Sequence, residues 1–96
     1  MHGEYKMPGG KLVVIDLEVS DGCLVNVQLS GDFFLEPDSA LHTINAALTG
    51  QPADAEETVF AITLRDALRS GEMMYGVSPE AIAVAVCRAL HANPRT

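Results

Sequence analysis

The sequence predicts an α+β fold, a two-layer sandwich in which an antiparallel β-hairpin or three-stranded sheet is covered by about three helices. Two observations predict it. Residues 13–20 and 25–33 alternate apolar and polar side chains, which is the period of half-buried strands. Three later segments carry apolar residues at helical spacing between helix start and stop signals. Because the strands precede the helices, we expect the helices to cover the apolar side of the sheet.

The turn of the hairpin decides which strand residues face each other. Asp21 and Gly22 could form a two-residue loop, but that loop sets Val19 opposite Leu24 and places the apolar sets of the two strands on opposite faces. We therefore expect a three-residue loop at 20–22, with Gly22 in the left-handed conformation. The register that follows pairs Val19 with Cys23, Leu17 with Val25, Ile15 with Val27 and Val13 with Leu29.

Residues 1–7 precede the hairpin and form either a brief edge strand or a flexible tail. Pro8, Gly9 and Gly10 then turn the chain. A phosphate-binding loop needs a longer spacing and a following helix, whereas a strand follows here, so the turn is the favoured interpretation.

Three helices are expected after the hairpin. The first starts near Pro37 and ends before Gly50, with Leu41, Ile44 and Leu48 on its buried side. The second follows an Asp54-x-x-Glu57 capping pattern and ends before Gly71, although residues 58–64 also have strand propensity. Residues 72–77 form a short extended connector. The third helix has Ser78 as its N-cap, buries Ile82 and Val86, and ends near Leu90, leaving 91–96 as a tail.

Length and charge limit the classes of function. The 96 residues make one domain, 1–96, and the initial Met with no linker predicts a complete chain. The formal net charge is −7 and the six Lys and Arg are scattered, which disfavours binding to nucleic acid. No apolar run is long enough to span a bilayer and no secretory signal is present, so we expect no membrane association and a cytoplasmic location.

No residue pattern predicts catalysis or metal binding by this chain. The three histidines have no ligand spacing, and Cys87 is expected to be a buried, inert thiol. Cys23 could serve in sulfur transfer or iron–sulfur assembly, but one thiolate cannot hold a cluster that normally takes four. We therefore expect no catalytic, cofactor-binding or metal residue.

Five residues are candidates for binding a partner protein. Leu12 and Val14 put apolar side chains on the otherwise polar face of the hairpin, and Phe34 has the parity of that face. Lys11 lies at the same end. Asp32 either caps the turn that leaves the hairpin or faces a cation of the partner.

Three phrases carry a resemblance to a known family. They are Pro-Gly-Gly-Lys-Leu-Val at 8–13, Ser-Gly-Asp-Phe-Phe-Leu-Glu-Pro at 30–37 and Gly-Val-Ser-Pro-Glu-Ala-Ile-Ala at 76–83. Because these phrases occur in this order, the chain resembles the accessory domain of lipoate-protein ligases from about Lys6 to Leu90. That domain occurs at the C-terminus of a long ligase or as a separate small subunit, and it is similar to the SufE/NifU-type fold.

The resemblance implies a non-catalytic accessory subunit. In that family ATP and Mg²⁺ activate lipoate to lipoyl-AMP, and the lipoyl group passes to a lysine of an acceptor protein. The sites for ATP, Mg²⁺ and lipoate would belong to a separate catalytic subunit, and lipoyl-acceptor proteins would be indirect partners. The alternatives are a sulfur or iron–sulfur assembly protein that uses Cys23, and a small interaction domain that forms a homodimer through Leu12 and Val14.

Overall fold

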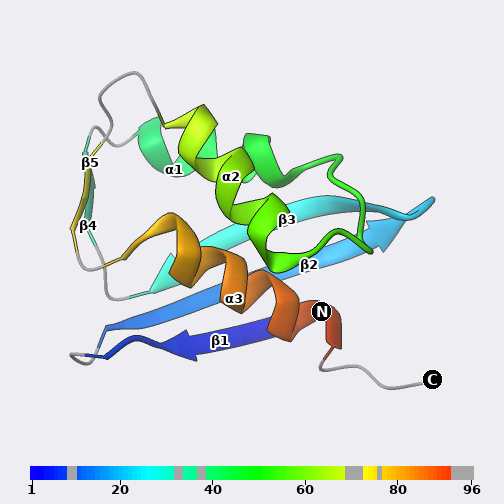
Figure 1. Ribbon diagram of the computed structural model, residues 1–96, viewed down its shortest axis with the longest axis horizontal. Helices are drawn as coiled ribbons and strands as arrows, with labels where there is room; N and C mark the ends of the chain where they lie inside the picture. The colour runs from blue at the N-terminus through cyan, green and yellow to red at the C-terminus, as the bar shows by residue number, and fades with distance from the viewer. Residues whose placement is uncertain (9–10, 32–33, 37–38, 69–72, 76, 92–96) are drawn as a thin grey trace.

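A three-stranded antiparallel sheet forms one layer of the molecule, and three helices form the other (Figure 1). The computed structural model describes residues 1–8, 11–31, 34–36, 39–68, 73–75 and 77–91. The sheet has the order β1-β2-β3 and confirms the predicted α+β class. Of the two alternatives for residues 1–7, an edge strand or a tail, the structure has the edge strand β1. The elements are β1 His2–Lys6, β2 Leu12–Ser20, β3 Cys23–Gly31, β4 Phe34–Glu36, α1 Ser39–Leu48, α2 Glu57–Ala67, β5 Met73–Tyr75 and α3 Pro79–His91.

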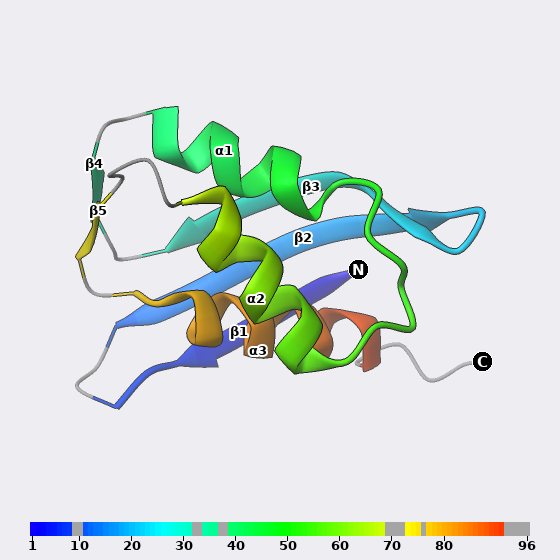
Figure 2. The same ribbon diagram turned by 45° about the horizontal axis from the view of Figure 1, so that its top comes forward.

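All three helices lie on the same side of the sheet (Figure 2). Helix α3 packs across β1 and β2, α1 packs along β3, and α2 contacts both other helices. Alternate residues of the strands point toward the helices and are buried with the inner helical residues. The largest of these buried side chains are Ile15, Leu17, Leu24, Ile44, Leu48, Phe60, Leu64 and Ile82.

The tip of the hairpin differs from the expected register. Ser20 pairs with Cys23, so the loop contains only Asp21 and Gly22, and the predicted three-residue loop is wrong. Both loop residues have positive φ, 53° and 77°, as a two-residue hairpin turn of the favoured hand requires. Close to the tip, Val19 therefore faces Leu24.

A β-bulge at Asn26 explains how the short loop is compatible with a single apolar face. Asn26 has φ 53°, and the register shifts so that Leu17 on β2 faces both Asn26 and Val27 on β3. The extra residue reverses the alternation of β3, so that Leu24 before the bulge and Val27 after it are both buried. Beyond the bulge the ladder pairs Asp16 with Gln28, Ile15 with Leu29, Val14 with Ser30 and Val13 with Gly31.

The first two helices occur where the sequence predicts them, but α1 buries a different set of residues from the expected one and α2 has a different N-cap residue. In α1 the buried residues are Ala40, Ile44 and Leu48, whereas Leu41, which was expected to be buried, is 37% exposed. In α2 the N-cap position is Glu56 rather than Asp54, and its side chain makes no capping hydrogen bond. Tertiary contacts of the apolar side, and not the cap, therefore hold the start of α2.

The third helix follows the prediction closely. The Ser78 hydroxyl oxygen accepts a hydrogen bond from the Ala81 backbone N–H at 3.1 Å, which is N-cap geometry. Ile82 and Val86 are buried as expected. The extended connector before this helix is strand β5, which pairs antiparallel with β4 as a second, two-stranded sheet. Strand β4 itself was not expected.

The two outer edges of the main sheet have different surroundings. At the β3 edge, the Leu24 N–H donates to the Gln51 carbonyl at 2.9 Å and the Leu24 carbonyl accepts from the Gly50 N–H at 2.7 Å. The Asn45 side-chain oxygen accepts from the Leu29 N–H at 3.1 Å. Helix α1 and the chain that follows it therefore cover the β3 edge, and β1 forms the other edge.

Candidate functional site: the helix-free face of the sheet

The face of the sheet that the helices do not cover is the candidate functional site, and we call it the open face. Gly3, Val13, Ile15 and Leu17 are buried under the helices, so the residues between them point the other way. After the bulge the same holds for β3. The open face comprises His2, Glu4 and Lys6 of β1, Leu12, Val14, Asp16 and Glu18 of β2, and Gln28 and Ser30 of β3.

One end of the open face is apolar. Leu12 and Val14 are half-buried there although no helix lies over them, and Lys11, which precedes β2, is exposed. On β1, Lys6 pairs with Leu12 and Glu4 pairs with Val14. Two of the five predicted partner-binding residues, Leu12 and Val14, thus lie at one end of the open face, and Lys11 precedes them in the chain.

The other two predicted partner-binding residues are not placed on this face. Asp32 lies outside the described residues. Phe34 begins β4, where its backbone pairs with Tyr75, and its side chain is outside the described part of the structure. Their assignment to a partner surface stays a prediction.

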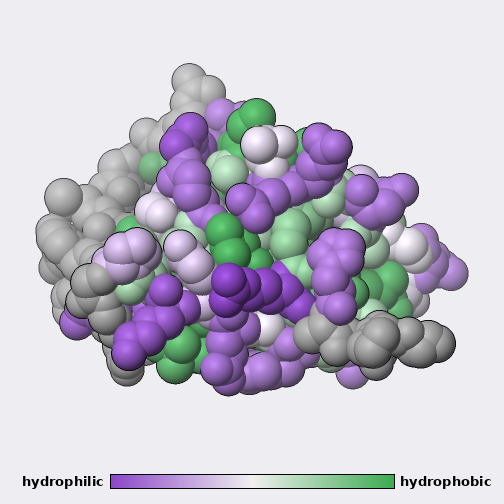
Figure 3. All heavy atoms as spheres, turned by 60° about the horizontal axis from the view of Figure 1, so that its bottom comes forward, coloured by the Kyte–Doolittle hydropathy of each residue, from purple (hydrophilic) through white to green (hydrophobic). Residues whose placement is uncertain are grey.

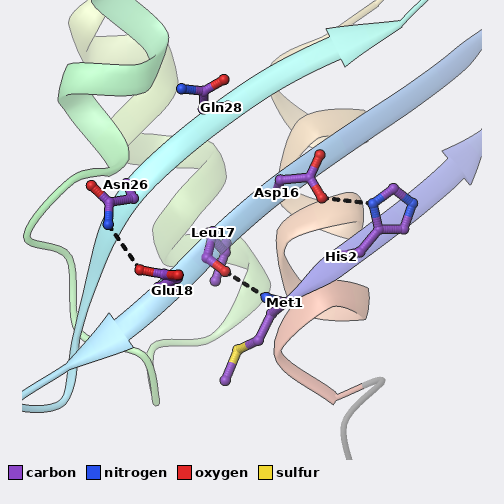
Figure 4. Close-up of a pocket in the computed structure, with 7 residues that line it drawn as sticks. All are labelled: Met1, His2, Asp16, Leu17, Glu18, Asn26 and Gln28. Carbon is purple, nitrogen blue, oxygen red and sulfur yellow. Dashed lines mark hydrogen bonds and ion pairs between the residues drawn. The ribbon is translucent and has the colours of Figure 1, made fainter.

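The opposite end of the open face is a polar hollow of about 570 Å³ (Figure 4). Asn26, at the bulge, donates a hydrogen bond to the Glu18 carboxylate at 2.8 Å. The Met1 amine donates to the Leu17 carbonyl at 2.7 Å, which continues the β1–β2 pairing to the first residue. The residues that line the hollow are Met1, His2, Asp16, Leu17, Glu18, Asn26 and Gln28.

The imidazole of His2 joins the edge strand β1 to the central strand β2 at this hollow. Its Nδ1 lies 2.7 Å from the Asp16 carboxylate on β2 (Figure 4). Its Nε2 lies 2.7 Å from the Glu4 carboxylate on the same strand. The hydrogen bond to Glu4 and then that to Asp16 raise the pKa of His2 above its usual value. Sequence reasoning missed this cluster, although alternation along β1 places His2 and Glu4 on one face. The missing information was the register that brings Asp16 opposite His2.

The two cysteines do not form a shared site. Cys23 begins β3 and Cys87 lies on α3, and both are free thiols with partial exposure. Burial, and then the negative charge of Glu57, raise the pKa of Cys87, so its thiol is a weak nucleophile at neutral pH. In the part of the chain that the structure describes, no three or more His, Cys, Asp or Glu side chains are arranged to hold a metal ion.

The surface seen toward the β1 edge of the molecule mixes hydrophobic and hydrophilic residues (Figure 3). Arg88 of α3 lies there, with its guanidinium 4.9 Å from the centre of the Tyr5 ring. It also donates a hydrogen bond to the Glu4 carbonyl at 3.2 Å.

No described helix is long and apolar enough to cross a membrane.

Comparison with solved structures shows a similar chain. It belongs to an archaeal lipoylation system from Thermoplasma acidophilum, which was described as a bi-partite lipoate protein ligase and its E2 lipoyl domain. The two folds superpose with a TM-score of 0.69 and 24% sequence identity, over 90% of this chain and 97% of the other. The chain shares its fold with a component of a lipoylation system. No family model and no curated protein sequence matches it.

Proposed function

We propose that this chain is the non-catalytic accessory subunit of a two-chain lipoate-protein ligase. The observation that carries the proposal is the match to a chain of the bi-partite lipoylation system over 90% of one chain and 97% of the other. Such coverage means that the similarity extends over the whole domain and is not limited to a single hairpin or helix pair. The three sequence phrases that resemble the accessory domain support the same function.

The proposed catalytic partner carries the sites for ATP, Mg²⁺ and lipoate. In this proposal the accessory chain holds none of these three ligands itself. The accessory chain would therefore act by binding one conformation of the catalytic chain more tightly than another. Lipoyl-AMP would form in the cytoplasm on the catalytic chain, and lipoyl-acceptor proteins would then be modified.

The apolar end of the open face is the proposed contact with the catalytic chain. Leu12 and Val14 present aliphatic side chains between polar neighbours, an arrangement in which a small apolar centre is ringed by polar groups. Lys11 lies beside them, and Asp32 and Phe34 complete the proposed set. Because the helices cover the other face, a partner can reach these side chains without disturbing the core.

The proposal is tested with the purified chain and the catalytic ligase chain from the same organism. We expect isothermal titration to show a complex, and lipoyl-AMP to form faster when both chains are present. The double substitution Leu12→Gln and Val14→Thr should weaken the complex at least about tenfold, because it removes apolar contact area at the centre of the interface.

Ile62→Gln is the matched control. Ile62 is 56% exposed on α2, on the helical side of the molecule, so this change also removes an exposed aliphatic side chain and should leave the affinity unchanged. The absence of a complex, together with equal rates of lipoyl-AMP formation with and without this chain, would overturn the proposed function. A complex that the double substitution does not weaken would overturn only the proposed contact surface.

A further inference from the structure

The environment of His2 indicates its protonation state. Both ring nitrogens lie 2.7 Å from carboxylate oxygens, Nε2 from Glu4 and Nδ1 from Asp16. An ionised carboxylate only accepts hydrogen bonds, whereas a neutral imidazole has one N–H and one lone pair. Two such contacts with ionised carboxylates therefore need a proton on each nitrogen, so this arrangement suits the imidazolium form of the ring.

The position of His2 gives this charge a structural consequence. Strand β1 is the edge of the sheet, and its first half is held by the ladder to β2 and by α3 behind it. Met1 and Leu17 exchange both backbone hydrogen bonds, at 2.7 and 2.9 Å, at the far end of that ladder. His2 is the next residue along β1, and its ring reaches across to β2 on the open face.

We propose that His2 is a proton-dependent clamp that holds the first half of β1 against β2. The clamp works through charge: the imidazolium lies between two carboxylates that would otherwise repel each other across the strands. The other charged groups that line the hollow around it are Glu18 of β2 and the Met1 amine. On α3, behind the sheet, Arg88 contacts β1 at Glu4 and Tyr5.

The sign of the pH dependence follows from the raised pKa of His2. Its contribution to folding stability is complete below the pKa of an unfolded histidine, about 6.5, and disappears as the pH rises through the higher folded value. Above that value one ring nitrogen turns a lone pair toward a carboxylate. The first half of β1 should then separate more often from β2. This inference does not depend on the proposed function.

Nuclear magnetic resonance of the full chain tests the clamp. We expect the ring of His2 to titrate above the value for an unfolded histidine, and to approach that value in the double variant Glu4→Gln and Asp16→Asn. The protection of the Leu17 amide, which is bonded to the Met1 carbonyl at 2.9 Å, should fall as His2 loses its proton, after correction for intrinsic exchange. The Leu24 amide, at the opposite edge, is the internal reference.

Two substitutions complete the experiment. His2→Gln should abolish the pH dependence of Leu17 protection in this range, and His42→Gln, an exposed histidine on α1, should leave it as in the natural chain. If the pH dependence persists in the His2→Gln variant, a group other than His2 controls the strand, and the clamp is overturned. A His2 ring that titrates identically with and without Glu4 and Asp16 would also overturn it.

Discussion

Gly3 is a residue at which β1 and α3 approach each other closely. A Cβ atom at this position would lie 2.3 Å from the Ala85 carbonyl oxygen and 2.4 Å from the Ala89 nitrogen. Both are backbone atoms of a helix, so they cannot move aside as the end of a flexible side chain can. The alanines of α3 and the missing side chain of Gly3 together let the helix lie directly on the edge strand.

Gly3→Ala should therefore destabilise the protein by about 2–3 kcal/mol, because the helix must shift away from the sheet and loses packing along its length. Urea unfolding measures the change. Ser30→Ala, at an exposed position on the open face, is the control and should change stability by less than about 0.5 kcal/mol. If the Gly3→Ala variant has the same urea midpoint as the Ser30→Ala control, the close approach of β1 and α3 does not exist in solution.

The β2–β3 hairpin shows which part of an element's structure is encoded locally. Alternation predicted both strands, and the Asp21-Gly22 pair is a strong signal for a two-residue loop. We excluded that loop because a regular ladder would then expose one apolar set. The structure keeps the loop and corrects the alternation with the bulge at Asn26. A bulge of this kind depends on long-range packing, so the pattern of apolar residues alone does not locate it.

The backbone conformation of Asn26 at the bulge predicts how substitutions there change the stability of the protein. Asn26 has φ 53°, a conformation that Gly adopts freely and Asn adopts more readily than most residues. Asn26→Gly should leave stability within about 0.5 kcal/mol of the natural chain, since it loses only an exposed hydrogen bond to Glu18. Asn26→Val should cost about 1–2 kcal/mol, because a β-branched residue is strained at this φ. Thermal or urea unfolding of the pair measures the difference.

Equal stability of the glycine and valine variants would mean that the hairpin slips to another register. Two-dimensional amide spectra would show this directly, since a slip by one residue turns each side chain to the other face.

The helices show a second limit of sequence analysis. Periodicity predicted that all three exist, but it placed Leu41 on the inner face of α1, where the structure buries Ala40 instead. The start of α3 was predicted to the residue because Ser78 and Pro79 carry a local capping signal.

At the scale of the whole molecule, the sequence predicted the layers and one part of the open face, but not the polar hollow. Leu12 and Val14 were identifiable because they are apolar residues at polar positions of one strand. The His2, Glu4 and Asp16 cluster joins residues from two strands, and its members are ordinary surface residues when each is taken alone. Only the β1–β2 register brings them together.

Arg88 is expected to limit self-association of the molecule through the β1 edge. Met1 and Leu17 form a hydrogen-bonded pair, and such pairs alternate with non-hydrogen-bonded pairs along an antiparallel ladder. The backbone N–H and C=O groups of His2, Glu4 and Lys6 therefore point away from β2, to the outer edge of β1. Arg88 covers the middle of this row by its bond to the Glu4 carbonyl. Arg88→Ala should uncover it and increase self-association in sedimentation experiments, whereas Arg65→Ala, on α2, should not. Identical sedimentation of both variants would contradict this role for Arg88.

The covered β3 edge also limits how many copies could join. A molecule with one free sheet edge can pair with only one other copy, whereas a molecule with two free edges can add a copy at each and form a chain. Among the described residues the main sheet offers only its β1 side for coupling, since Gln51, Gly50 and Asn45 occupy the other. Strand pairing between copies through this sheet would therefore stop at two, and a fibril built by successive addition to it has no second end from which to extend.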